Sequence, residues 1–504
     1  MKILYVIVMI CMLFTMDSMS FAKSKTHQKK NKVITKPYSF AKTPLYGSLA
    51  LSADLNNAIY AEGSRNNNVD IAVYVKSMRY GDSLYLRNIN QRLTPASTLK
   101  IFTAEAALIY LGPNYRFSTQ ILTDAKEIKG GVLQGNLYVV LTGDPTLTYD
   151  DLTDLADKLK MQQIQAISGN VYIDNTAYDQ RFYGPGWEGK DKQYCYGAPI
   201  SASIINRNCL SFKMTPSQVG RATRVVTSPQ YFYPGIRNTV VTSMPKRACS
   251  VKLSTDPGSV ISIEGCMPKN QQAWGLSYVV TDIPEYNRSL FKNLLSQASI
   301  RVYGRVTFGS APDRLAYLAS HQSEPLRTLV NEMLKKSDNV IAGALFKKLG
   351  QLYTGRQGSW ESGSFAVTNI LSKEAGVNVN GLRILDGSGL SPDNLTTPQQ
   401  IMQVLDFAYH HYQTSYDFIS ALPIAGVDGT LKHRLTHVAR RVRAKTGTIS
   451  GVVTLAGYAV AWNKEPLAFV IMVNGPTGMR WRYKLLEDKI VTSLTRYVRT
   501  ENQA

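Results

Sequence analysis

Residues 94–108 are Thr-Pro-Ala-Ser-Thr-Leu-Lys-Ile-Phe-Thr-Ala-Glu-Ala-Ala-Leu, a stretch that predicts a helix with reactive groups at its start. Thr94 is a good helix N-cap, Pro95 suits the first helical position, and the alanine-rich continuation favours a helix. Ser97 and Lys100 are three residues apart, so on a helix they share a face. Because a serine hydroxyl needs a base to take its proton, a neutral Lys100 amine would make Ser97 a nucleophile.

Two later segments complete the pattern in a set order, Ser-Asp-Asn at 337–339 and Lys-Thr-Gly at 445–447. Ser337 lies between two helical patterns, and its hydroxyl can relay a proton between Lys100 and a leaving amine. Asn339 offers an amide that can hold a substrate peptide bond. These residue types at these places indicate acyl transfer through a serine.

The Lys-Thr-Gly segment precedes a strand-like run. Lys445 and Thr446 suit the terminal carboxylate of a substrate, and Gly447 lets the substrate backbone approach closely. The backbone N–H of Thr448 would be one oxyanion donor, and that of the nucleophile, in the first helical turn, the other. Burial and the nearby Lys445 cation would both depress the pKa of the lysine that activates the serine.

Other chemistries have little support in the sequence. The six histidines form no His-Glu-x-x-His, and His410-His411 lies in a helical pattern that we interpret as structural or exposed. Ser388 is the one alternative nucleophile, but its surroundings, 386–391, lack the full nucleophile-elbow pattern. We interpret Ser388 as a loop residue near the site. No metal site and no cofactor are predicted.

The first 40 residues of the sequence bear on targeting. Residues 1–22 combine Lys2, a short apolar run and small residues before Ala22, which predicts a cleaved export signal; an uncleaved anchor is the alternative. The lysine-rich leader at 23–40 is predicted to be disordered, or to attract an acidic envelope surface, in a chain with a formal charge of +21. The export signal and the lack of a binding motif argue against nucleic acid.

Four cysteines follow the signal: Cys195, Cys209, Cys249 and Cys266. An even number in an exported chain predicts two disulfides. Pairing of sequence neighbours is the simplest choice, although the sequence allows three connectivities.

With 504 residues the chain is expected to form two or three domains. Short Val, Ile, Tyr and Thr runs between Gly, Pro and Asn turns make 112–311 mostly β, while helical patterns precede and follow it. A β-rich insertion in an α+β protein is therefore expected.

On these segments the chain resembles the D-alanyl-D-alanine carboxypeptidases/endopeptidases of the class C, low-molecular-mass penicillin-binding type, peptidase family S13. The long interval between Lys100 and Ser337 supports the resemblance. So do four further segments, at 142–147, 198–202, 386–390 with Asn394, and 425–431.

The resemblance implies a split transpeptidase-like or β-lactamase-like domain, an antiparallel sheet with flanking helices, that carries a nested, mostly β insertion of two domains. The expected parts are catalytic domain I at 41–115 and 315–504, domain II at 116–200 and 285–314, and domain III at 201–284.

It also implies an activity, the removal of terminal D-Ala from murein pentapeptides and cleavage of D-Ala–diaminopimelate cross-links in the periplasm. The acyl-enzyme would be trapped by β-lactams, and the partners would be peptidoglycan stem peptides. A β-lactamase or esterase on the same scaffold, and a non-catalytic peptidoglycan-binding scaffold, are the alternatives. The sequence does not decide between carboxypeptidase and endopeptidase activity, and it does not give the oligomeric state.

In such proteins an acidic residue of the second domain contacts the amine of the substrate's diamino acid. The segment 185–196 matches that region, so Asp191 is the candidate for this acidic residue and Tyr196 for a wall of the site. The alternative is that Asp191 is a solvated loop residue. Pro392 and Ser450 depart from the expected pattern, which bears on side-chain specificity and not on the core chemistry.

Overall fold

The computed structural model describes residues 43–63, 68–228, 235–245, 248–255 and 260–500. The predicted export signal and basic leader lie outside these residues. From Thr43 the chain forms one compact unit. No helix within the described ranges is long and apolar enough to cross a bilayer.

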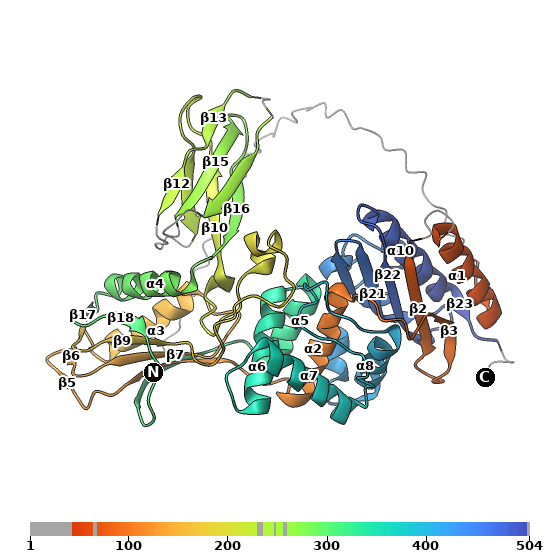
Figure 1. The fold of residues 1–504 in the computed structure, drawn as a ribbon, viewed down its shortest axis with the longest axis horizontal. Coiled ribbons are helices and arrows are strands. Elements are labelled where there is room, and N and C mark those ends of the chain that lie inside the picture. The colour runs from red at the N-terminus through yellow and green to blue at the C-terminus, as the bar shows by residue number, and fades with distance from the viewer. Residues whose placement is uncertain (1–42, 64–67, 229–234, 246–247, 256–259, 501–504) are drawn as a thin grey trace, which may run out of the picture. The chain divides into compact units, whose positions relative to one another are not determined.

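A five-stranded antiparallel sheet joins the two ends of the described chain. Its strands, in spatial order, are β20 (Val442–Ile449), β21 (Val452–Val460), β22 (Pro466–Asn474), β2 (Asp70–Ser77) and β3 (Ser83–Arg87). Nearly every residue of β21 and β22 is buried, because helices cover both faces of the sheet. In Figure 1, α1 (Gly47–Gly63) and α10 (Arg480–Arg496) lie on one side of this sheet, and α2 (Lys100–Tyr110) and α8 (Pro398–His410) lie on the opposite side.

Helix α2 (Lys100–Tyr110) is the centre of the helical layer, and its residues from Lys100 to Leu108 are all buried. The helices around it are α5 (Leu326–Lys336), α6 (Asn339–Thr354), α7 (Trp360–Ala375), α8 (Pro398–His410) and α9 (Ser415–Ala421). A helix packed on all sides takes mostly small and apolar residues, which explains its alanine-rich sequence. Lys100, Thr103 and Glu105 are its buried polar residues.

The predicted start of this helix is wrong. Thr94 does not cap it: its hydroxyl donates to the Pro392 carbonyl oxygen at 3.1 Å. The chain enters α2 through a 3₁₀ turn, Ala96–Leu99, that follows Pro95. Ala96 has a φ of 46°, so the backbone reverses here and cannot continue a helix begun at Pro95.

The segment between α2 and α5 is mostly β, as the residue pattern predicts. One sheet has the order β18, β9, β7, β4, β19, and a second has the order β17, β8, β6, β5. Their strands are β4 (Ser118–Thr123), β5 (Ile128–Lys129), β6 (Val132–Leu133), β7 (Leu137–Leu141), β8 (Ala166–Ile167), β9 (Val171–Asp174), β17 (Arg301–Val302), β18 (Val306–Phe308) and β19 (Ala316–Gln322). Helices α3 (Tyr149–Met161) and α4 (Ile283–Gln297) belong to this part.

Near the two ends of the described chain, β1 (Leu45–Tyr46) pairs in parallel with β23 (Tyr497–Val498). The remaining strands form a three-stranded sheet, β11-β10-β16, and a four-stranded one around β15. They are β10 (Cys209–Thr215), β11 (Arg224–Ser228), β12 (Ile236–Asn238), β13 (Val241–Ser243), β14 (Val251–Thr255), β15 (Ile261–Pro268) and β16 (Trp274–Val279). Disulfides join Cys195 to Cys209 and Cys249 to Cys266, the two local pairs.

One proposed domain boundary needs adjustment. β19, which begins at Ala316, pairs with β4, so the predicted boundary at 315 does not separate β19 from the β-rich sheet. The other boundaries stay predictions.

A buried ion pair ties the last described residues to the end of the main sheet. Arg499 Nη2 lies 2.9 Å from Glu465 Oε1 and 2.7 Å from Asp82 Oδ1. Glu465 is fully buried and also accepts a hydrogen bond from Ser77 Oγ at 2.6 Å. Removing the guanidinium would therefore leave a buried carboxylate without its cation.

We expect Arg499→Met to lower the free energy of unfolding by about 3 kcal/mol, because Glu465 then stays buried without a countercharge. Asp82→Asn is the matched control: this partner is largely exposed, so its loss should cost less than about 1 kcal/mol. Chemical denaturation of both variants checks this, and equal effects would contradict the assignment.

Candidate active site

The turn that carries Ser97 is held between a loop and a strand. Gly389, at a φ of +78°, packs so closely that a Cβ there would collide with the Ala96 carbonyl. On the other side, a Cβ on Gly447 would lie 3.0 Å from the Ser97 backbone nitrogen. The strained Ala96 conformation is thus imposed by its neighbours, as strain at reactive sites commonly is.

The Lys100 amine lies among three oxygen atoms. Its Nζ is 3.0 Å from Ser97 Oγ, 2.6 Å from Asn339 Oδ1 and 2.7 Å from the Ser388 carbonyl oxygen. The amide and carbonyl oxygens can only accept hydrogen bonds. They therefore take the two protons of a neutral amine, and the lone pair is left facing the Ser97 hydroxyl.

Burial favours this neutral form. Lys100 has no exposed surface, and desolvation lowers its pKa to about 7, opposed by the negative charges of Asp386 and Asp338. A base whose pKa lies near neutrality can take and return a proton at physiological pH.

A second buried lysine, Lys445, contacts Ser337. Its Nζ donates to Ser337 Oγ at 2.8 Å and to the Thr446 carbonyl oxygen at 2.7 Å. Burial and, secondly, the charge of Lys100 lower the pKa of Lys445 well below its usual range. An anionic ligand would offset both effects, so this end of the site favours a carboxylate.

Ser337 and Asn339 are placed by the junction of α5 and α6. Ser337 ends α5 in the left-handed conformation, with a φ of 59°. Asp338 then caps α6 by accepting from the Ile341 N–H at 2.9 Å, and it pairs with Arg207. Asn339, the first residue of α6, donates from Nδ2 to the Tyr196 carbonyl oxygen at 2.8 Å.

A cleft of about 630 Å³ opens above these groups. The predicted residues that line it are Ser97, Asp191, Tyr196, Ser337, Asn339, Thr448 and Ser450. Lining residues that the sequence analysis missed include Glu188, Lys190, Thr477, Gly478 and Arg480. No motif marks the last three, which reach the cleft because α10 begins beside the end of the sheet.

Asp191 and Tyr196 lie together at the rim of the cleft. The Tyr196 hydroxyl donates to Asp191 Oδ1 at 2.8 Å, and the Tyr196 ring stacks on Tyr194 with 5.5 Å between centroids. The adjacent disulfide links Cys195 to Cys209 at the start of β10. The structure thus brings the candidate acidic residue and its neighbouring wall to the same site as Ser97.

Thr446 has a partner that the sequence analysis did not name. Its hydroxyl donates to Thr430 Oγ1 at 2.7 Å. Thr430 belongs to the segment 425–431, which marks the family resemblance, but no spacing indicates that it reaches Thr446. Ser388, by contrast, is fully buried and contributes its carbonyl oxygen.

The described residues contain no cluster of His, Cys, Asp and Glu side chains suited to a metal ion.

Several known proteins are similar to this chain in sequence. The model of the D-Ala-D-Ala carboxypeptidase 3 (S13) family matches residues 51–496. The D-alanyl-D-alanine carboxypeptidase DacB of Haemophilus influenzae is 31% identical over 448 residues, covering 85% of this chain and 92% of that protein. The D-alanyl-D-alanine carboxypeptidase of Actinomadura sp. (strain R39) is 32% identical over 423 residues, covering 81% of this chain and 78% of that protein.

Solved structures have a fold similar to that of this chain. The crystal structure of penicillin binding protein 4 (dacB) from Haemophilus influenzae matches with a TM-score of 0.78 and 30% identity, over 88% of this chain and 99% of that one. A structure of that protein complexed with a novel β-lactam matches with a TM-score of 0.72 and 29% identity, over 87% of this chain and 97% of that one.

We expect Gly389→Ala to slow acylation of Ser97 about a hundredfold, because the added Cβ must push the Ala96 carbonyl and so displace the reactive turn. Gly112→Ala is the matched control, since Gly112 has nearly the same φ, +79°, but no atom within 4 Å of the new Cβ. The rate of covalent labelling by a fluorescent penicillin measures the difference. Equal rates in the two variants would show that backbone conformation and not the contact matters.

Proposed function

The chain belongs to the D-Ala-D-Ala carboxypeptidase 3 (S13) family and is a penicillin-sensitive serine DD-peptidase of peptidoglycan; from this premise we propose how its residues divide the reaction. The substrates are murein peptides that end in D-Ala or are cross-linked through D-Ala. The observation that carries the proposal is the position of the Lys100 amine, 3.0 Å from Ser97 Oγ, with the Asn339 and Ser388 oxygens as acceptors for its other protons.

Acylation begins with transfer of the Ser97 hydroxyl proton to Lys100 Nζ. The Ser97 oxygen attacks the carbonyl carbon of the penultimate D-Ala, and the N–H groups of Ser97 and Thr448 stabilise the oxyanion. As the peptide bond breaks, the leaving amine takes a proton from Ser337, which regains one from Lys100. Asn339 holds Lys100 in place and offers its amide to the substrate.

The terminal carboxylate of the substrate binds at the other end. Lys445 and the hydroxyls of Thr446 and Thr430 supply the donors, and the carboxylate stabilises the ammonium form of Lys445. Gly447 keeps this strand free of a side chain where the substrate backbone passes. Water then attacks the acyl-enzyme with Lys100 again as base, releasing the shortened peptide and restoring the Ser97 hydroxyl.

Asp191 and Tyr196 are proposed to contact the diamino acid that precedes the penultimate D-Ala. A carboxylate at the cleft rim suits the side-chain amine, and the Tyr196 ring suits the methylene chain.

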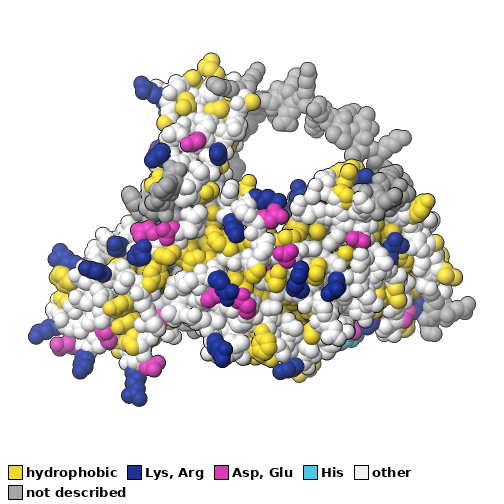
Figure 2. All heavy atoms as spheres, viewed as in Figure 1, with side chains coloured by type: hydrophobic (Ala, Val, Ile, Leu, Met, Phe, Trp, Pro, Cys, Tyr) yellow, Lys and Arg dark blue, Asp and Glu magenta, His cyan; other side chains and the backbone are white. Residues whose placement is uncertain are grey.

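We place this activity in the periplasm, after cleavage of the export signal near Ala22. Sequence pattern and substrate location support this. On the face drawn in Figure 2, Lys and Arg side chains are spread over the described surface with Asp and Glu among them. We propose that the lysine-rich leader at 23–40 contributes to attraction toward an acidic envelope surface.

We expect Ser97→Ala to abolish covalent penicillin labelling and to slow D-Ala release by a factor on the order of 10⁴, because no other group can form the acyl-enzyme. Ser388→Ala keeps the carbonyl that Lys100 contacts and should retain labelling. Mass spectrometry of the labelled proteins and of peptide products reports both. Labelling that survives in the Ser97 variant, or disappears only in the Ser388 variant, would overturn the nucleophile assignment.

The rate of acylation should depend on pH through Lys100. Below its pKa of about 7 the amine carries a proton and has no lone pair, so the second-order rate constant for benzylpenicillin falls as the pH falls. Above that pH the rate constant reaches a plateau. Stopped-flow measurements from about pH 5 to 9 test this, and a rate constant that is flat or decreases through neutrality would contradict the role of base.

A further inference from the structure

The segment that carries Asp191 and Tyr196 is a loop with closed ends. The N–H of Ile200 donates to the Phe182 carbonyl oxygen at 2.8 Å, so the two ends of the segment from 182 to 200 lie next to each other. Between these ends the regular structure consists of two short 3₁₀ turns. Such a loop depends on outside contacts for its position. We call it the rim loop.

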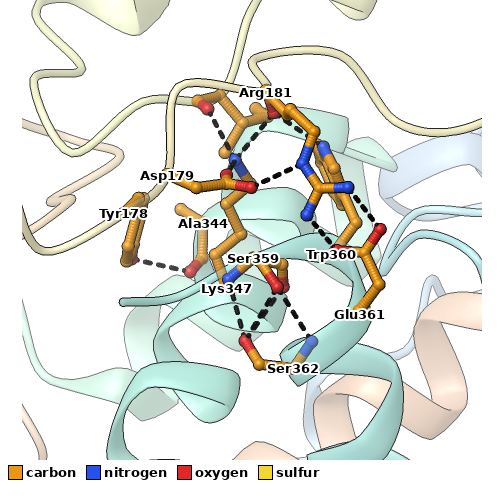
Figure 3. Close-up of polar contacts among 10 residues, drawn as sticks. Tyr178, Asp179, Arg181, Ala344, Lys347, Ser359, Trp360, Glu361 and Ser362 are labelled. Atoms are coloured by element: carbon orange, nitrogen blue, oxygen red, sulfur yellow. Dashed lines mark hydrogen bonds and ion pairs between the residues drawn. The ribbon is translucent and has the colours of Figure 1, made fainter. Parts of the chain in front are cut away.

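Helix α6 supplies such a contact at the base of the rim loop (Figure 3). Lys347 has no exposed surface, and its Nζ donates to the Arg181 carbonyl oxygen at 2.9 Å and to the Ile200 carbonyl oxygen at 3.3 Å. It also donates to Asp179 Oδ1 at 2.8 Å. One ammonium group thus binds both ends of the loop.

The surroundings of Lys347 hold it in this position. Its Nζ lies 4.8 Å from the centre of the Trp360 ring, and the Trp360 indole N–H donates to the Arg181 carbonyl oxygen at 2.8 Å. The Arg181 guanidinium pairs with Asp179 and with Glu361. Burial lowers the pKa of Lys347, and the hydrogen bond to the Asp179 carboxylate opposes that change.

The rim loop also touches the reactive groups. The Trp187 indole N–H donates to Asp386 Oδ2 at 2.6 Å, and Asp386 organises the segment whose Ser388 carbonyl contacts Lys100. At the far end of the loop, the Tyr196 carbonyl accepts from Asn339. Asn339 begins α6 and Lys347 lies two turns farther along it, so one helix holds both the base and the rim of the loop.

We propose that Lys347 is a positioning residue that sets Asp191 and Tyr196 over Ser97 and thereby determines selection of the substrate's diamino acid. Its effect falls mainly on recognition, because its contacts are to the two ends of the loop and to Asp179, and none is to Ser97 or Lys100. The proposal rests on the proposed function of Asp191.

The test compares Lys347→Met with Lys348→Met. Lys348 is the next residue of α6 and is also buried, with a pKa that burial lowers to about 8. Its Nζ donates to Gln351 and faces the rings of Phe117 and Tyr178, so it contacts no residue of the rim loop. Both variants lose one buried ammonium, but only one loses the loop contact.

Three substrates separate recognition from chemistry: benzylpenicillin, a pentapeptide with a free diaminopimelate side-chain amine, and the same peptide with that amine acetylated. For Lys347→Met, kcat/KM for the free-amine peptide should fall about ten- to hundredfold, mostly through KM. Its preference over the acetylated peptide should disappear, while penicillin acylation changes less than about threefold. Lys348→Met should keep the wild-type preference.

A Lys347→Met enzyme that retains its preference for the free amine would overturn the proposal, as would an equal loss in Lys348→Met. Should Lys347→Met bind no penicillin, Asp179→Asn provides a second test. This variant weakens the hydrogen bond between Lys347 and residue 179 and must show the same loss of preference. A wild-type enzyme that releases D-Ala without distinguishing the two peptides would contradict the role of Asp191 itself. Absence of D-Ala release from either peptide would contradict the proposed reaction instead.

Discussion

The buried amine of Lys100 is the constraint on which the site depends. A lysine without exposed surface must have hydrogen-bond partners, and they come from three separate segments: Ser97 in its own turn, Asn339 at the start of α6, and the Ser388 carbonyl. The fold therefore has to bring these segments together before the amine can be buried. The same burial gives the amine a pKa suited to proton transfer, so the stability requirement and the chemistry have one cause.

The architecture supplies these contacts from rigid elements. Helix α2 is surrounded by helices and backed by the main sheet, and β20 and the loop at Gly389 press on the turn before it. Two non-glycine residues next to the reactive groups, Ala96 and Ser337, have left-handed conformations. Such conformations persist only where neighbouring structure determines them. Close packing at Gly389 and Gly447 is what determines the first of them.

The residues proposed for recognition are separate from this rigid centre. Asp191 and Tyr196 lie on the rim loop, whereas the reacting groups lie on helices and a strand. Helix α6 connects the two parts, since Asn339 is at its first residue and Lys347 holds the loop base. A loop held at its ends can change its side chains without disturbing the nucleophile. Pro392 and Ser450, which depart from the family pattern, both line the cleft.

The sequence alone determined the three reactive segments, because Ser97 and Lys100 need only helical spacing to meet and the other segments follow in a set order. Hydrophobic patterns likewise predicted the β character of the insertion and the strand-like run after Lys-Thr-Gly. Only the tertiary structure showed that Thr94 is not a cap, that Thr430 meets Thr446, that Arg480 reaches the cleft, and that Lys347 is buried against the rim loop. Each of these depends on a contact between residues far apart in the chain, for which local propensity and spacing carry no signal.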